Sequence, residues 1–545
     1  MLILLSLLTS LARLVCINAS PTIQLGNTTL IGLGIPTFQQ DLFAGIPFAE
    51  PPLGSLRLKP PMLKAGLNSD TFDATSFGPA CLQTVLPLDQ VSEDCLTVNV
   101  LRPTETLVGA KLPVMFWTYG GGFFEGFSVV YNASGIVAQS VIRGTPVIYV
   151  NFNYRLGPLG FPQGQEADSN GALNLGLKDQ IAALEWVQLN IGAFGGDPDK
   201  VTLFGQSAGS IMTSILFLNS PLTKLARAAI FESGSQASTP LFAPQSQEIN
   251  WQNFVGGVPS CASIATSGNT FSCLQNATTT EIFQGLSVVL PADSVVSPFN
   301  PVMDGPEGFI PDLPSVLFKR GQFSRLPFIA GTDLDEGTLF TPTTVNSTQE
   351  IEEGAIGLFS PSISPANLEQ SVLNLLSLYP DIPALGWSPF NTGNNTFGLS
   401  PQYKRAAAIV GDLDFLSQRR LWIETAANAG VPTFGYLFTQ PQPELPPLLG
   451  VEHSSEITYV YGALADNSSS SILLSRIMTD YWVSFATSLT PNDGLGVVPR
   501  PEWTQFTPQN KAVIQLNGTN ITMIPDDFRA EQTGFINSDP AIWRH

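Results

Sequence analysis

The residues best suited to chemistry are one serine in a glycine-flanked motif and one internal histidine. Ser207 stands in a Gly-x-Ser-x-Gly pattern over residues 205–209. A serine that attacks a carbonyl group needs a base that takes its proton near neutral pH, and the unperturbed pKa of histidine suits that task. The chain has 545 residues but only two histidines, His453 and the C-terminal His545, where nothing follows to hold the side chain in place. We therefore expect His453 to be the base.

The serine motif is weak by itself, because a chain rich in glycine and serine also forms loops without chemistry. Its surroundings favour a catalytic turn. The apolar run at 201–204 predicts a strand and residues 210–218 predict a helix, which together are the strand–turn–helix of a nucleophile elbow. The turn is strained, and a side chain at Gly205 or Gly209 would collide with neighbouring elements.

Three glycines, residues 120–122, follow another apolar run at 113–119. Glycines let backbone N–H groups face a ligand closely, and acyl transfer needs such donors where negative charge develops on the carbonyl oxygen. We expect the N–H groups of Gly121, Gly122 and Ala208 to form an oxyanion hole. The alternative is a flexible turn.

The histidine needs an acid that fixes its tautomer. In α/β-hydrolases the chain order is serine, acid, histidine, so the acid should lie between residues 207 and 453, just after a strand. The strand expected at 326–330 precedes a segment with three acids, Asp333, Asp335 and Glu336. The residues alone leave all three open.

These residues must be positioned by a scaffold that alternates strands with helices. Helical spacing predicts helices at 174–192 and 472–487. Apolar strands alternating with helices indicate an α/β fold, with a large, mostly parallel central sheet and helices on both faces. The remaining apolar runs, at 145–153, 228–231 and 432–438, predict further buried strands.

Composition limits the function classes. A net charge of −20 argues against nucleic acid and against an anionic membrane surface. The apolar start of the chain predicts a signal peptide over residues 1–19, cleaved after Ala19, followed by a single domain over 20–545. No later apolar stretch has spanning length, and no histidine cluster or Cys-x-x-Cys motif favours a metal. We expect a secreted protein without a membrane anchor, metal or organic cofactor.

Cysteines and sequons fit an extracellular compartment. Cys16 would leave with the signal peptide, and the four remaining cysteines pair by nearness as Cys81–Cys95 and Cys261–Cys273. Each bond should stabilise by roughly 3 kcal/mol on the loop-entropy model. Potential N-glycosylation sites are Asn27, Asn132, Asn276, Asn346, Asn394, Asn467, Asn517 and Asn520.

Several segments, taken in order, resemble the type-B carboxylesterase/lipase family, which includes cholinesterases, secreted fungal lipases and neuroligins. The resemblance covers nearly the whole mature chain and implies the α/β-hydrolase fold. It aligns the family's Asp-Glu-Gly motif with residues 335–337, which makes Glu336 the triad acid beside Ser207 and His453. The two cysteine pairings resemble the family's first two disulfides. The segments are 43–52, 92–100, 153–157, 174–180, 194–198 and 204–209.

The chain departs from the family at three places. Gln206 replaces a glutamate common before the nucleophile, and Tyr119 stands where some esterases have histidine. The first disulfide loop, Leu82 to Asp94, is short where similar lipases carry a helical lid, and it lacks the aromatic residue that binds choline in cholinesterases. By analogy with the family's lipases, Leu339 and Phe340 are expected to line the acyl pocket, and core packing is the alternative.

The sequence thus predicts a secreted serine hydrolase of carboxylic esters whose substrates are apolar small-molecule or lipid esters. The short loop predicts weak or absent interfacial activation. A non-catalytic, neuroligin-like binding module on the same fold is the alternative, since fold does not determine function.

Overall fold

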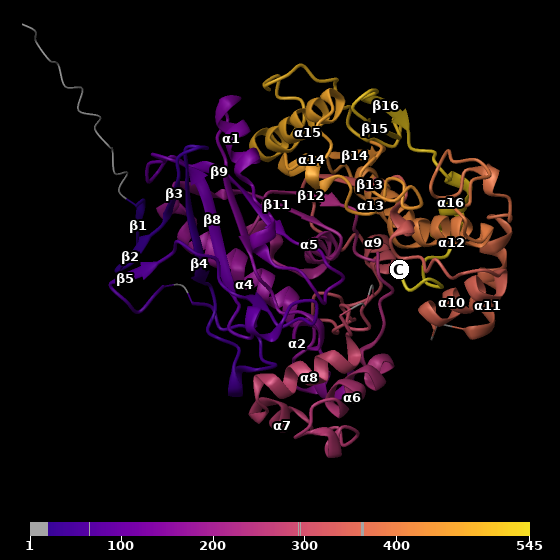
Figure 1. The fold of residues 1–545 in the computed structure, drawn as a ribbon, viewed down its shortest axis with the longest axis horizontal. Coiled ribbons are helices and arrows are strands. Elements are labelled where there is room, and N and C mark those ends of the chain that lie inside the picture. Colours follow the sequence, from indigo (N-terminus) through magenta and orange to yellow (C-terminus); the bar gives the residue numbers. More distant parts are fainter. Residues whose placement is uncertain (1–19, 65, 293, 295, 361–363) are drawn as a thin grey trace, which may run out of the picture.

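The computed structural model describes residues 20–64, 66–292, 294, 296–360 and 364–545 (Figure 1). The expected signal peptide, with its cleavage point after Ala19 and with Cys16, lies outside the described residues. Among the described residues, no helix has both the length and the apolar character needed to cross a bilayer.

A central sheet of eleven strands, counted over the described residues, organises the chain. Neighbouring strands run parallel from β10 through to β15, and antiparallel pairing occurs only towards the two edges. The predicted mostly parallel sheet is therefore confirmed. In spatial order the strands are β16 (Thr522–Pro525), β15 (Ala512–Leu516), β14 (Thr433–Phe438), β13 (Phe328–Asp333), β12 (Ala228–Glu232), β11 (Gly196–Gln206), β9 (Leu112–Thr118), β10 (Ile148–Phe152), β8 (Thr97–Pro103), β4 (Gln40–Pro47) and β3 (Leu33–Ile35).

Two small sheets accompany the central one. The first joins β1 (Thr22–Leu25), β2 (Thr28–Ile31) and β5 (Thr71–Asp73), and the second joins β6 (Ala80–Cys81) to β7 (Val91–Ser92).

Helices cover the sheet, as the complete burial of β10, β12 and β13 requires. Helix α5 packs on β11 and β12, α13 packs on β13 and β14, and α15 packs together with α1 and α14. The helices of this layer are α1 (Ser134–Ile142), α4 (Leu175–Asn190), α5 (Ala208–Asn219), α13 (Ser417–Asn428), α14 (Ile457–Tyr461) and α15 (Ser469–Ser488).

Most of the longer helices outside this layer lie in two lobes away from the sheet (Figure 1). Three of them, α6, α7 and α8, form the lobe at the bottom of the view, and α10, α11, α12 and α16 form the lobe at the right. Their bounds, with those of three short helices, are α2 (Gly157–Gly160), α3 (Gly164–Ser169), α6 (Glu248–Gly256), α7 (Phe271–Asn276), α8 (Thr279–Val289), α9 (Pro314–Lys319), α10 (Thr348–Phe359), α11 (Pro365–Ser377), α12 (Pro401–Gly411) and α16 (Ala530–Ser538).

The predicted strands and helices are present, with shifted ends. β13 begins at Phe328, two residues later than expected, because Pro327 has no N–H to donate to a neighbouring strand. β11 begins at Gly196, which pairs with Leu112 of β9, and the polar residues Asp197, Asp199 and Lys200 follow before pairing resumes at Val201 in a shifted register. Those polar residues hide the start of the strand from an apolar pattern.

The right-hand lobe has its own small core, and the C-terminus is fixed beside it. Apolar side chains of α10, α11, α12 and residues 536–543 pack together apart from the main core. Contrary to the expectation of an unheld end, His545 is 1% exposed, its ring lies against Gln418 and Phe359, and its carbonyl group accepts a hydrogen bond from Ser315.

Candidate active site

The nucleophile elbow has the strained geometry that its glycines imply. Ser207 lies between β11 and α5 with φ 55° and ψ −129°, a conformation that non-glycine residues rarely adopt. A Cβ at Gly205 would lie 2.7 Å from the carbonyl oxygen of Thr118, and one at Gly209 would overlap the same oxygen. The expected collisions are confirmed. The side chain of Ser207 remains partly exposed although its neighbours are buried.

The internal histidine is held from both sides of its ring. His453 Nδ1 lies 2.5 Å from Glu336 Oε2, and both side chains are 3% exposed. On the other side, Nε2 lies 3.1 Å from the amide nitrogen of Gln206, which also donates to Ser454 Oγ at 2.8 Å. An amide nitrogen only donates, so His453 Nε2 is the acceptor and the ring proton is on Nδ1, facing Glu336. This is the tautomer of a general base.

The structure separates the three candidate acids by their contacts. Only Glu336 reaches the imidazole ring. Asp335 accepts N–H groups from Phe390 and Val451 at 2.9 and 3.0 Å and so ties loops together. Asp333 accepts the N–H of residue 455 at 3.1 Å.

Two aromatic side chains pack against the imidazole ring of His453. The ring of Phe340 lies 5.0 Å from that of His453, and Phe415 lies 4.7 Å from it. Phe415 comes from a π-helical turn, Asp412–Leu416, between α12 and α13. Of the two residues expected to line a pocket, Phe340 thus borders the base, whereas Leu339 is 42% exposed.

The expected oxyanion donors carry free N–H groups. Within the described chain, the N–H groups of Gly121 and Gly122 donate no backbone hydrogen bond, and Ala208 begins α5, where the N–H has no acceptor within the helix. Gly121 and Gly122 have φ values of +100° and +56°, which favour glycine, and a Cβ at Gly121 would overlap the carbonyl oxygen of Glu125. The loop also touches the elbow, since a Cβ at Gly120 would lie 2.8 Å from Ser207 Cβ. The arrangement can stabilise negative charge beside the serine.

Three further buried carboxyl groups, those of Glu232, Asp333 and Glu456, lie near Glu336 and His453. Burial raises the pKa values of Glu232 and Asp333 well above their usual range and that of Glu456 to about 7. Burial also raises the pKa of Tyr436, and the charges of these acids and of Glu336 add to its shift. In the described residues no cluster of histidine, cysteine, aspartate or glutamate has the geometry to hold a metal ion.

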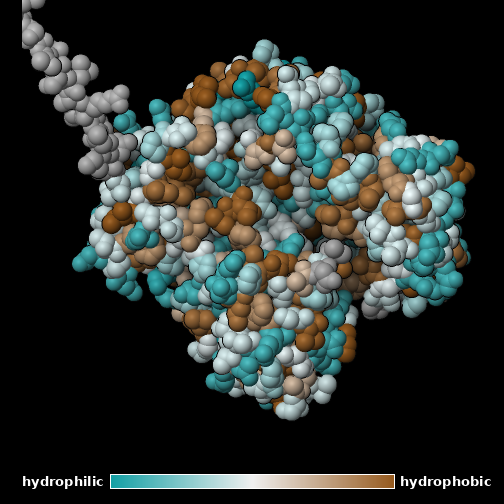
Figure 2. Space-filling view, in the orientation of Figure 1, coloured by the Kyte–Doolittle hydropathy of each residue, from teal (hydrophilic) through white to brown (hydrophobic). Residues whose placement is uncertain are grey.

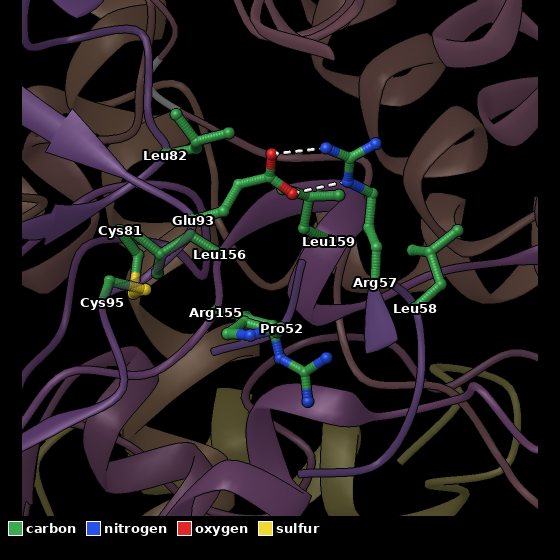
Figure 3. Close-up of a pocket in the computed structure, with 10 residues that line it drawn as sticks. All are labelled: Pro52, Arg57, Leu58, Cys81, Leu82, Glu93, Cys95, Arg155, Leu156 and Leu159. Carbon is green, nitrogen blue, oxygen red and sulfur yellow. Dashed lines mark hydrogen bonds and ion pairs between the residues drawn. A yellow bond between two sulfur atoms is a disulfide. The ribbon is translucent and has the colours of Figure 1, made fainter. Parts of the chain in front are cut away.

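The first disulfide loop is fixed in place beside this site. Disulfides join Cys81 to Cys95 and Cys261 to Cys273. Glu93, inside the first loop, receives two hydrogen bonds from Arg57 at 2.6 and 2.7 Å (Figure 3).

The same loop contacts the chain that follows the glycines. The side chain of Gln83 exchanges two hydrogen bonds with the backbone of Gly126, both at 3.0 Å. The cavity under the loop, drawn in Figure 3, measures about 10 Å³, room for about one water molecule. The loop contains only short strands and a single turn of 3-10 helix, Leu88–Gln90.

Three features of the site were not predicted from the sequence. Phe415, Asp333 beside Glu456, and the contact of Gln206 with the ring all depend on segments that meet only in the fold. A usable signal existed for Gln206 alone, because it directly precedes the nucleophile.

Known proteins are similar to this chain over nearly its whole length. The profile of the family described as "Carboxylesterase family" matches residues 19–536. Lipase 2 of Geotrichum candidum is 33% identical over 94% of both chains. Lipase 4 of Diutina rugosa is 33% identical over 97% of this chain and 98% of its own. The crystal structure of Aspergillus niger EstA superposes with a TM-score of 0.83 at 26% identity, covering 97% of this chain and all of the other.

Proposed function

Because the chain belongs to the carboxylesterase family and is a carboxylic ester hydrolase, we propose that it works through a Ser207–His453–Glu336 triad and an acyl-enzyme. The observation that carries the proposal is the pair of contacts on His453. Nδ1 faces Glu336, so Nε2 is the ring nitrogen that can accept a proton, and it accepts a hydrogen bond from Gln206, the residue before Ser207.

In the proposed first half-reaction, Ser207 Oγ bonds to the ester carbonyl carbon and its proton passes to His453 Nε2. Glu336 stabilises the imidazolium, and Gly121, Gly122 and Ala208 donate N–H groups to the oxyanion. The C–O bond to the alcohol then breaks, and the alcohol leaves with the proton from Nε2.

In the second half-reaction, water attacks the acyl carbon and gives a proton to His453. The bond to Ser207 Oγ breaks, and Oγ takes that proton back as the carboxylic acid leaves. In both half-reactions the imidazole must turn so that Nε2 leaves the Gln206 amide and faces Ser207. The contact between Nε2 and Ser207 Oγ then forms in the Michaelis complex.

We further propose that the substrates are apolar esters. Phe340 and Phe415 place apolar surface against the base, which favours an acyl chain over a charged group. A panel of p-nitrophenyl esters from C2 to C18, with one sterol ester, tests this. Faster hydrolysis of the medium or long acyl esters supports the proposal, and a preference restricted to acetate opposes it.

The short, anchored loop supports weak or absent interfacial activation. The disulfide and the two hydrogen bonds from Arg57 to Glu93 keep the loop from opening as a lid. Specific activity should rise smoothly as a triglyceride passes its solubility limit, and a sharp jump there would count against the proposal.

Secretion is the proposed localisation. The structure contains two disulfides, which persist in oxidising compartments. Relatives at 33% identity include a "Secreted triacylglycerol lipase" of Gibberella zeae and "Secreted lipase 1" of Botryotinia fuckeliana. Activity in the culture medium, with the processed N-terminus sequenced, tests the proposal.

Figure 2 shows apolar surface around a hollow near the middle of one face of the molecule, within an otherwise mixed surface.

A further inference from the structure

Two buried carboxyl groups lie together next to Glu336 and the chain that follows His453. Asp333 ends β13, and Glu456 lies three residues after His453; they are 2% and 0% exposed. Their side chains lie within hydrogen-bonding reach of each other. Yet, apart from a contact of the Glu456 carboxyl group with its own backbone N–H, Oδ1 of Asp333 and both carboxyl oxygens of Glu456 receive no hydrogen bond from a donor in the described chain. Ionised carboxylates only accept, so the two groups can bond only if one of them carries a proton.

The surroundings oppose two charges at this place. Glu232 from β12, Tyr436 from β14 and Glu336 from the turn after β13 face the pair, as does His453. The ion pairs found in the described residues include no arginine or lysine bound to any of these acids. Like charges in a buried site disfavour each other's ionisation. In agreement with this, burial and the charge of Glu456 raise the pKa of Asp333.

The two carboxyl groups are also tied to both members of the catalytic pair. The backbone N–H of Asp333 donates to Glu336 Oε1 at 2.8 Å. The carboxyl group of Asp333 accepts the N–H of Ser455, two residues after His453, at 3.1 Å. Any movement of Asp333 would therefore shift the acid and the base together.

We propose that Asp333 and Glu456 form a positioning pair that shares one proton, holds Glu336 and the His453 loop in register, and contributes a single negative charge felt by the imidazole. The inference rests on the proposed triad. A shared proton satisfies the facing oxygens and leaves one charge, which adds to that of Glu336 in stabilising the imidazolium.

The test is the acid limb of the pH profile of kcat/KM, measured for wild type, Asp333→Asn, Glu456→Gln and the double variant on one p-nitrophenyl ester. Each single amide donates an N–H to the remaining carboxylate and so reproduces the shared proton. Single variants should keep the apparent pKa of the acid limb within about 0.3 of wild type. The double variant removes the charge and should lower that pKa by about 1.

Two other patterns overturn the proposal. If each single variant lowers the pKa by a similar step and the double variant adds them, both carboxyls are ionised and share nothing. If the double variant leaves the pKa unchanged, His453 senses no charge from the pair. Glu166→Gln is a matched control, because Glu166 is a buried acid that accepts N–H groups from Thr270 and Phe271. It should lower the melting temperature without moving the acid limb.

If the double variant does not fold, a second measurement tests the proposal. Burial also raises the pKa values of Glu232 and Asp414, so these groups contribute equally to every spectrum, and the readout is the wild-type-minus-variant infrared difference near pH 6. That difference should show the loss of one protonated-carboxyl band in Asp333→Asn and in Glu456→Gln. Persistence of that band in both single variants overturns the proposal. Labelling of wild type by a fluorophosphonate keeps the two questions apart, because failure of the triad abolishes labelling whereas failure of the pair leaves it intact.

Discussion

The side-chain amide of Gln206 donates to Nε2 of His453 across 3.1 Å, on the ring nitrogen that must accept the proton of Ser207. The residue before the nucleophile therefore sets the electrostatic environment of the base. A neutral amide at this point adds no attraction for the imidazolium, in contrast to a carboxylate.

Gln206→Glu should favour the charged form of the imidazole, because a carboxylate beside Nε2 stabilises the imidazolium. The neutral, basic form of the ring then appears only at higher pH. The acid limb of kcat/KM should move up by about 1 pH unit, with activity lost at pH 6 and largely kept at pH 8. Gln206→Met is the neutral control, and an acid limb displaced equally in both variants would rule out the electrostatic explanation.

Glu336→Gln should lower kcat by roughly 10³–10⁴, because the amide can present the wrong group to Nδ1 and cannot stabilise the imidazolium. Asp335→Asn is the matched comparison, one residue earlier. It loosens the contacts with Phe390 and Val451 and should lower the melting temperature while kcat stays within about tenfold. The reverse order of effects on kcat would assign the acid to Asp335.

Gly121→Ala should lower kcat by roughly 10²–10³, because the added Cβ meets the carbonyl oxygen of Glu125 at φ +100° and displaces an oxyanion donor. Gly192→Ala adds the same methyl group where no atom lies within 4 Å. Steady-state kinetics on both variants check this. Equal losses in the two would mean that the glycine loop has no special role.

Features of the site whose residues are close together in the sequence could be predicted, whereas contacts between distant segments could not. The elbow at Ser207 and the glycine loop were predictable because strand, turn and helix are contiguous in the chain. The choice of Glu336 among three acids within four residues needed the family resemblance, since periodicity cannot tell which carboxyl faces a ring. Its partner His453 is 117 residues away.

Other parts of the site have no local signature. Phe415 reaches the ring from a π-helical turn, a local widening of a helix that ordinary helical spacing does not mark. The facing of Asp333 and Glu456 arises only when β13 and the His453 loop meet in the fold.

Stability should fall as pH rises through the folded-state pKa of Asp414. Burial raises that pKa to about 7, and Oδ1 of Asp414 has no hydrogen-bond partner in the described chain. The folded state therefore holds a proton that the unfolded state releases near pH 4, so this contribution is complete below about pH 4 and is lost towards pH 7.

Asp414→Asn removes this dependence. Relative to wild type, the variant should gain about 3 kcal/mol of unfolding free energy between pH 5 and pH 8. Melting temperatures of both proteins at the two pH values check the prediction, and parallel shifts in wild type and variant would contradict it. Comparing the two proteins cancels other groups, including His545, whose pKa burial lowers to about 3.

The central claim is that Ser207 is the activated nucleophile, and covalent labelling tests it most directly. A fluorophosphonate should modify the folded wild type once, and peptide mass spectrometry should place the adduct on Ser207. Ser207→Ala should remain unlabelled, and His453→Asn should label far more slowly because the base is gone. A folded wild type that stays unlabelled, or an adduct on another residue, would contradict the account.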